Sequence, residues 1–252
     1  MAGPKKVRAD LLLIERGVAG TPAEAVGLLL AGKVMASEPD RPELKIEKPG
    51  TPLHPGTHFR ILGEPRLYVS RAGQKLAGAL DHFGVDPAGW ICADLGLSTG
   101  GFTDCLLKRG AARVHGVDVA YGVVDWKLRG DPRLVLHERT NARTLPPLAF
   151  GEPVRLVVAD LSFISLTQIL PAAVAQLQPQ AELVLLVKPQ FELPAEATDG
   201  GVVRDEQARQ RAINGVREAA TTLGLVVCGG VDSSLAGADG NVEHLLHLER
   251  RP

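Results

Sequence analysis

The stretch from residue 93 to residue 110, ADLGLSTGGFTDCLLKRG, decides the class of fold. An apolar strand ends near Asp94, a glycine-rich turn follows, and a helical pattern opens at Gly101. In open α/β sheets, ligands bind beyond the carboxyl ends of the strands, and glycines in such a turn let a ligand approach the backbone closely. We therefore expect an α/β domain with a ligand site at this turn.

From residue 70 onward, short apolar runs alternate with helical stretches. The alternation predicts a parallel sheet with helices on both faces. The runs are almost continuously apolar, which fits strands that are buried on both faces. They lie at residues 90–96, 113–119, 133–137, 155–161, 182–189, 225–231 and 243–248.

The N-terminal part of the chain has another pattern. Residues 8–32 predict two short helices, the second capped by Thr21 with Pro22 at its first position. Residues 37–56 are rich in proline and charge, which predicts turns and edge strands rather than a core. We predict a small domain at residues 1–63, a linker at 64–70 and a larger domain at 71–252.

Composition excludes several classes of protein. The chain has 252 residues, of which 45% are hydrophobic and 23% charged, so it is not a mostly disordered protein. No apolar run approaches the ~18 residues of a membrane span. The run at residues 11–14 is stopped by Glu15 and is too short for a signal peptide, so we expect an unprocessed, cytoplasmic chain. The widely spaced cysteines are expected to be buried thiols: Cys92, Cys105 and Cys228.

The net charge of −1 hides an asymmetry along the chain. Residues 1–80 hold 12 Lys and Arg against 8 Asp and Glu, whereas residues 81–252 hold 16 against 21. A basic N-terminal part joined to an acidic remainder suggests that a polyanionic partner binds the N-terminal part. Aromatic residues make up only 4%, which argues against binding through an aromatic stacking platform, and no metal-ligand spacing is present.

The candidate ligand is S-adenosylmethionine. Asp118 ends the second strand, 24 residues after Asp94, where a carboxylate can bind both hydroxyls of a ribose. The loop reads GLSTGG and lacks the GxGxxG spacing of a dinucleotide site. Asp94 beside the loop would repel a pyrophosphate but can pair with an ammonium, which S-adenosylmethionine has. The alternative is a purely structural turn.

Five motifs carry a resemblance to a known family. DLGLSTGGFTD is preceded by SRAGQKL and followed by VVADLSFISL, LLVKPQFE and GNVEHLLHL. In this order they resemble the TlyA family over residues 8–249. These are rRNA ribose 2′-O-methyltransferases with an FtsJ-like domain, historically labelled haemolysins.

The resemblance implies a fold, an activity and a partner. The fold is a Rossmann-like S-adenosylmethionine-dependent methyltransferase sheet with a small N-terminal α-L-type RNA-binding domain. The activity is 2′-O-methylation of a ribose, that of a cytidine, in ribosomal RNA. The partner is ribosomal RNA or a ribosomal subunit, with no membrane and no metal.

The family's catalytic tetrad falls by motif on Lys75, Asp160, Lys188 and Glu243. A 2′-hydroxyl is a poor nucleophile and must lose its proton as it attacks the methyl group. Lys188, at the end of an apolar strand, is the candidate base, since burial or a neighbouring cation favours the neutral amine. Lys75 would supply that cation, and the two acids would position the lysines and the ribose. Taken alone, each of the four residues could equally be a helix cap or a solvent-exposed surface residue with no catalytic role.

The resemblance also implies the binding residues. The family's RNA-binding helix usually begins Ser-Arg, whereas this chain has Thr21-Pro22 there and so lacks that arginine. RNA contacts are therefore expected from other basic residues, namely Lys33, Arg66 and Arg71. Ser162, Phe163 and Phe191 either line the substrate pocket or pack in the core. Cofactor contacts are expected from Asp94, Gly96, Ser98, Gly100, Gly101, Asp118, Asn141 and Asp160.

Three other functions compete with this reading. A non-catalytic RNA-binding or ribosome-assembly protein would need a broken tetrad or loop, and all four positions are intact. A membrane-lytic protein would need an apolar span or a strongly amphipathic helix. A small-molecule methyltransferase would leave the N-terminal domain without a role.

Overall fold

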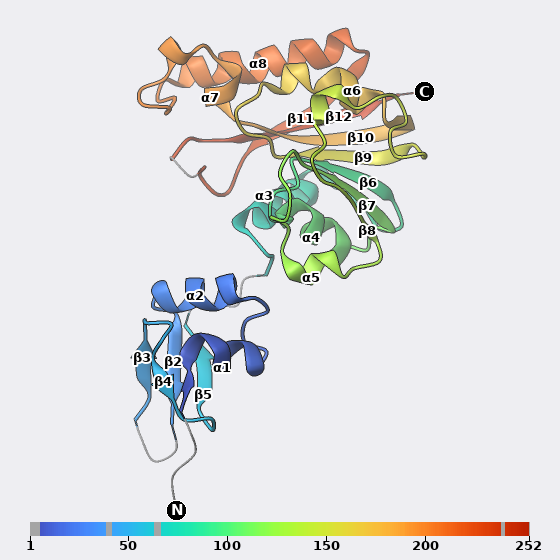
Figure 1. Ribbon diagram of the computed structural model, residues 1–252. Coiled ribbons are helices and arrows are strands. Elements are labelled where there is room, and N and C mark those ends of the chain that lie inside the picture. The colour runs from blue at the N-terminus through green and yellow to red at the C-terminus, as the bar shows by residue number, and fades with distance from the viewer. Residues whose placement is uncertain (1–5, 39–41, 63–66, 238–239, 252) are drawn as a thin grey trace, which may run out of the picture. The chain divides into compact units, whose positions relative to one another are not determined.

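The computed structural model describes residues 6–38, 42–62, 67–237 and 240–251. The chain divides into two compact units, Met1–Arg66 and Leu67–Pro252. Figure 1 labels the elements of both.

The smaller unit packs two helices and short antiparallel strands around its own apolar core. As expected, Thr21 caps the second helix, because its Oγ1 accepts the Glu24 N–H at 3.2 Å. The elements are β1 (Val7–Arg8), α1 (Ala9–Glu15), α2 (Pro22–Leu30), β2 (Val34–Ser37), β3 (Leu44–Ile46), β4 (Pro52–Leu53) and β5 (His58–Ile61).

The larger unit is built on one sheet with the strand order β11-β12-β10-β9-β6-β7-β8. Its strands are β6 (Ile91–Leu95), β7 (Arg113–Val117), β8 (Leu134–His137), β9 (Val154–Ala159), β10 (Leu177–Val187), β11 (Leu225–Asp232) and β12 (His244–Arg250). Its helices are α3 (Arg71–Phe83), α4 (Gly101–Lys108), α5 (Trp126–Arg129), α6 (Leu170–Val174), α7 (Pro189–Glu192) and α8 (Glu206–Thr222), with short 3-10 turns η1 (Ala142–Thr144), η2 (Leu166–Gln168) and η3 (Ala195–Ala197).

The expectation of a wholly parallel sheet is wrong at β12. This strand runs antiparallel to both of its neighbours, β10 and β11. The reason is the length of the connection, residues 233–243, which is shorter than the dozen or more residues that a parallel crossover needs. The chain therefore turns back as a hairpin and inserts β12 between β10 and β11.

Helices cover both faces of the sheet, as the apolar strands predict (Figure 1). Along β10, Leu183, Leu185 and Val187 join the core under α6 and α8. The alternate residues Val184 and Leu186 join the core under α3, α4 and α5. This period of two places every second side chain of a strand on each face, so both faces must be apolar.

Two expectations about burial and membranes can be compared with the structure. Cys92 and Cys105 are buried as expected, but Cys228 is exposed. Cys228 lies on β11, the edge strand of the sheet, and the register of the pairing with β12 shifts between Val227 and Gly229. Its side chain therefore does not enter the core. Within the described residues, no helix has the length and apolar character needed to cross a bilayer.

The first turns of α3 and α4 contact each other at Gly101. A Cβ at Gly101 would lie 2.1 Å from Ser70 Oγ and 3.0 Å from the Cβ of Ala72. Real side chains do not approach so closely, so only glycine at this position lets the two helices keep their contact. This contact is important because α4 begins where the glycine-rich loop ends and α3 carries Lys75.

We expect Gly101→Ala to destabilise the fold by about 1–3 kcal/mol, because the added methyl group must push α3 and α4 apart. Gly215→Ala is the matched control, since Gly215 lies in α8 with open space around its Cβ position. That control should stabilise the protein by about 0.5–1 kcal/mol, the ordinary gain for alanine over glycine in a helix. Urea denaturation of both variants tests this, and equal effects would contradict the packing argument.

Candidate functional site

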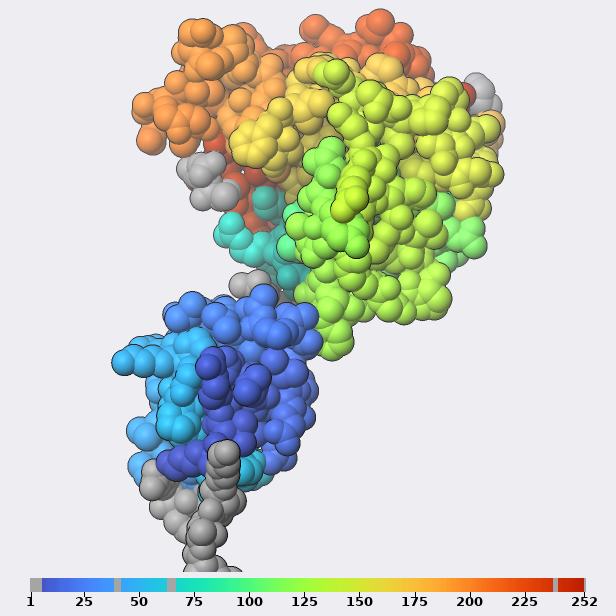
Figure 2. Space-filling model, in the orientation of Figure 1, coloured from blue at the N-terminus to red at the C-terminus, as the bar shows by residue number. Residues whose placement is uncertain are grey.

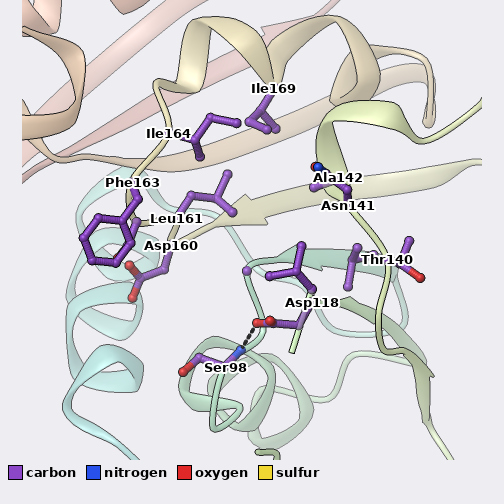
Figure 3. A pocket seen from close by; sticks show the side chains of 14 residues that line it. Ser98, Asp118, Thr140, Asn141, Ala142, Asp160, Leu161, Phe163, Ile164 and Ile169 are labelled. Atoms are coloured by element: carbon purple, nitrogen blue, oxygen red, sulfur yellow. Dashed lines mark hydrogen bonds between the residues drawn. The ribbon is translucent and has the colours of Figure 1, made fainter. Parts of the chain in front are cut away.

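A cleft of about 380 Å³ lies at the edge of the sheet where β6, β7, β8 and β9 end. One side is apolar and comes from Leu161, Ile164 and Ile169, which follow β9. The opposite side is polar and comes from Ser98 and Asp118 (Figure 3). The other lining residues are Gly96, Val117, Val119, Thr140, Asn141, Ala142, Asp160, Ser162 and Phe163. An apolar slot with a few directed polar groups is typical of a small-molecule site.

Asp118 shapes the polar side of the cleft. Its Oδ2 accepts the Ser98 N–H at 2.7 Å, and its Oδ1 accepts the Ala120 N–H at 2.7 Å. Each carboxylate oxygen has a second lone pair, so Asp118 can still accept bonds from a ligand. This acid therefore fixes the glycine-rich loop and faces the cleft at the same time.

A second cavity of about 60 Å³ adjoins the first and shares Gly96, Ser98 and Asp160 with it. The loop reaches this position only because residue 96 is glycine. Its φ is +88°, and a Cβ there would lie 2.6 Å from the main-chain oxygen of Asp160. The glycine thus brings the loop against the end of β9 and joins the two cavities into one elongated site.

Asp94 lies behind the loop and is completely buried. Its Oδ2 accepts the hydroxyl of Thr103 at 2.7 Å, while Oδ1 has no hydrogen-bond partner among the described residues. Burial raises the pKa of Asp94 to about 7; the bond from Thr103 opposes this shift, and the charges of Asp160 and Asp118 add to it. A buried carboxylate with a spare acceptor is poised to pair with a cationic ligand group.

We expect the Asp94→Asn variant to unfold at a higher temperature than the wild type, by a margin that depends on pH. The pKa of the Asp94 carboxyl is 3.8 in the unfolded chain, whereas in the folded protein its pKa is about 7. Between these values only the unfolded state gains the charge, so wild-type stability falls with rising pH. The advantage of the asparagine variant should therefore be larger at pH 8 than at pH 5 in thermal melts. A margin that does not change with pH would contradict the raised pKa.

Lys75 and Glu243 form a buried ion pair next to the site. The ammonium of Lys75, on α3, donates to Glu243 Oε2, just before β12. Only 9% and 4% of the two side chains are exposed. Gly237 covers the acid, since a Cβ there would lie 2.6 Å from Glu243 Oε1.

Lys188 and Asp160 form a second, more open pair. Lys188 Nζ lies 2.7 Å from Asp160 Oδ1 and donates to Ser162 Oγ at 3.0 Å. Lys188 directly follows Val187, which pairs with His244, and Glu243 directly precedes that histidine. The register of β10 and β12 therefore brings both ion pairs to one rim of the sheet. All four residues of the predicted tetrad are collected there.

We expect Glu243→Gln to destabilise the protein by about 3–5 kcal/mol, because it leaves the Lys75 ammonium buried without a counter-charge. The double variant Lys75→Met, Glu243→Gln should recover most of that loss, since no buried charge remains. Glu47→Gln is the control, because it breaks the exposed pair with Lys45 and should cost less than about 1 kcal/mol. Chemical denaturation measures all three, and a small loss for Glu243→Gln alone would contradict the burial of the pair.

The predicted cofactor residues fall into two groups. Gly96, Ser98, Asp118, Asn141 and Asp160 line the larger cleft, and Gly101 lines the smaller cavity. Asp94 and Gly100 line neither, and a Cβ at Gly100 would lie 2.3 Å from Leu128 Cδ1, away from both cavities. Asn141 also behaves as a turn residue, because its Oδ1 accepts the Arg143 N–H at 3.0 Å.

The predicted RNA-binding residues lie in different parts of the chain. Lys33 is half-buried in the turn between α2 and β2, and Arg71 is exposed at the start of α3. Neither forms an ion pair with another described residue. Arg66 lies outside the described residues.

Sequence reasoning missed several residues of this site. Thr103 holds Asp94, and Thr140, Leu161, Ile164 and Ile169 line the cleft. A hydroxyl nine residues after an acid, or an isoleucine in an apolar run, carries no local signal of a ligand site. Only the position of Thr103 on the first turn of α4, facing the end of β6, was in principle deducible from the helical repeat.

Comparison with known proteins gives consistent matches. The pattern of the FtsJ-like methyltransferase family matches residues 68–250. The 16S/23S rRNA (cytidine-2′-O)-methyltransferase TlyA of Mycobacterium tuberculosis is 46% identical over 246 residues, covering 97% of this chain and 90% of that protein. Hemolysin A of Brachyspira hyodysenteriae is 34% identical over 244 residues, covering 96% and 99%. A solved structure from Streptococcus thermophilus that also carries the name hemolysin has a TM-score of 0.74 at 37% identity, covering 98% of this chain and 89% of that one.

Proposed function

Because this chain belongs to the TlyA group of FtsJ-like methyltransferases, we propose that it methylates a ribose 2′-hydroxyl of ribosomal RNA, that of a cytidine, with S-adenosylmethionine as methyl donor. The observation that carries the proposal is the convergence of Lys75, Asp160, Lys188 and Glu243 at one rim beside the cleft. A non-catalytic assembly protein has no need of such a cluster.

The residues around the cleft fit S-adenosylmethionine. When bound, this cofactor supplies a methyl group activated by a sulfonium. Asp118 would accept the ribose hydroxyls, and the apolar side with Leu161, Ile164 and Ile169 would pack against the adenine. The smaller cavity would hold the methionine end, against the glycine-rich loop and Asp160. Gly96 makes this possible, because it lets one loop border both cavities.

Lys188 is the residue we assign to the 2′-hydroxyl. Its side chain is only 12% exposed, and it lies against Asp160, which lines both cavities. Asp160 and Ser162 hold two sides of the amino group, which leaves a third position for the target oxygen. Once the Lys188 ammonium has released one proton to solvent, its free lone pair would take the proton of the 2′-hydroxyl at this position as the oxygen attacks the methyl group. Such assistance is worth about 10²–10⁴-fold in rate.

Lys75 and Glu243 would support the site without contacting the substrate. Their pair joins α3 to the start of β12 and so fixes the wall of the site next to Lys188. Two lysines and two acids at one rim balance in charge, which lets the site accept a substrate whose phosphates are negative. Alignment of methyl group and oxygen by this wall would supply the rest of the acceleration.

Phe163 would bind the target base. The residue is 91% exposed at the mouth of the site. The centroid of its ring lies 5.2 Å from the ring centroid of Phe191. In the space-filling view the segments after β9 (yellow) and after β10 (orange) lie next to each other at the surface (Figure 2). An exposed aromatic face next to a ribose-directed lysine suits a base that has been turned out of its stack.

We expect the full chain to transfer labelled methyl groups from S-adenosylmethionine to the ribose of one nucleotide in purified ribosomal subunits. Lys188→Ala and Lys188→Arg should both lose at least about 100-fold in rate, because alanine removes the amine and arginine keeps its charge but cannot accept a proton. Cofactor affinity should stay within a few-fold, since Lys188 does not line either cavity. Full activity of the arginine variant would refute the base role, and wild-type labelling of neither subunit would refute the substrate.

A further inference from the structure

One partly buried carboxylate outside the tetrad joins the two loops that carry Asp160 and Lys188. Glu192, at the end of α7, accepts the Leu166 N–H on Oε1 at 2.8 Å and the Ser165 hydroxyl on Oε2 at 2.5 Å. We propose that Glu192 is a positioning residue that holds the loop after β9 so that Phe163 faces the target base. This inference rests on the proposed function, since it concerns the same substrate.

The loop needs such support because Phe163 is held in an unfavourable conformation. Its φ is +65°, a left-handed value that bulky side chains rarely adopt. With 91% of the residue exposed, Phe163 has little packing of its own to maintain this conformation. A strained residue persists only where its surroundings determine the backbone.

Both supports of the loop come from the segment 188–192. Before Phe163, Lys188 contacts Asp160 and Ser162. After Phe163, Glu192 binds Ser165 and Leu166, and between the two supports the ring of Phe191 lies 5.2 Å from that of Phe163. The backbone of Phe163 is therefore fixed from both sides by one short segment.

The environment of Glu192 makes these two bonds important. Burial raises the pKa of Glu192, and the bonds from Ser165 and the Leu166 N–H oppose that shift. Within the described part of the chain, no Lys, Arg or His lies at ion-pair distance from Glu192, so these donors compensate its burial. Bonds to an ionised acceptor are stronger than neutral ones and more costly to lose.

The mechanism predicts which parameter changes. If Glu192 fixes Phe163, its loss leaves Asp118, Ser98 and Asn141 in place, because these residues belong to other elements. The same loop also carries Leu161 and Ile164, which line the apolar side of the cleft, so cofactor affinity should fall a few-fold. The rate of methyl transfer to RNA should fall more than cofactor affinity does. A residue that merely kept the cleft folded would change both equally.

The test is a double-mutant cycle on the full chain, with single-turnover methyl transfer to ribosomal subunits as the readout. Glu192→Ala should lower the rate at least about tenfold in the wild-type background, because the loss of a single bond to a charged acceptor already has that size. In the Phe163→Ala background it should lower the rate less than about twofold, because the residue through which Glu192 acts is gone. Glu192→Gln, which keeps an acceptor for Leu166, should recover part of the rate.

Glu218→Ala is the matched control, because Glu218 is an exposed glutamate on α8, far in sequence from both the loop after β9 and the segment 188–192. It should leave rate, cofactor affinity and melting temperature unchanged. Equal effects of Glu192→Ala in both backgrounds would overturn the proposal, and so would a tenfold loss of cofactor affinity. If the wild type labels no RNA, the proposed function fails and this inference with it; if the wild type is active and the cycle is additive, only the inference fails.

Discussion

One parallel pairing, that of β6 with β9, supports the whole site. Because Leu95 lies opposite Ala159, the next residues of the two strands, Gly96 and Asp160, leave the sheet side by side. The loop after β6 then passes within contact distance of the Asp160 main-chain oxygen, which only glycine permits. This crossing borders both cavities and places the proposed catalytic acid at their junction. Any side chain at position 96 would separate the cofactor site from the chemistry.

The two ion pairs at the rim differ in what they can do. The pair of Lys75 and Glu243 is almost fully buried, so its charges are shielded from water and from substrate, and it connects α3 to β12. The pair of Lys188 and Asp160 is more open and borders the cleft. Buried pairs contribute order at the cost of desolvation, whereas partly open pairs can exchange partners with a ligand. The structure thus contains one buried and one more open pair, and we propose that only the open pair takes part in the reaction.

Average composition does not describe where the aromatic side chains lie. Aromatic residues make up only 4% of the chain, but the rings of Phe163 and Phe191 lie next to each other, and the first residue is almost wholly exposed. A single aromatic face suffices when only one base is bound, because each stacked base needs one ring. The relevant quantity is the local arrangement of rings, which composition does not report.

The sequence by itself determined the class of fold and the family, and it pointed to the residues that we propose as cofactor loop and tetrad. Strand–helix alternation, the glycines after Asp94 and the five ordered motifs are local patterns, and local patterns report periodicity and turn chemistry. Tertiary structure alone decided that β12 runs antiparallel, that Asp94 and Gly100 lie behind the cleft, and that Lys75 pairs with Glu243 across 168 positions of sequence. It also decided the exposure of Cys228 and the contacts of Glu192. These features depend on strand order, register and the approach of distant segments, and such contacts leave no periodic trace in the residues that make them.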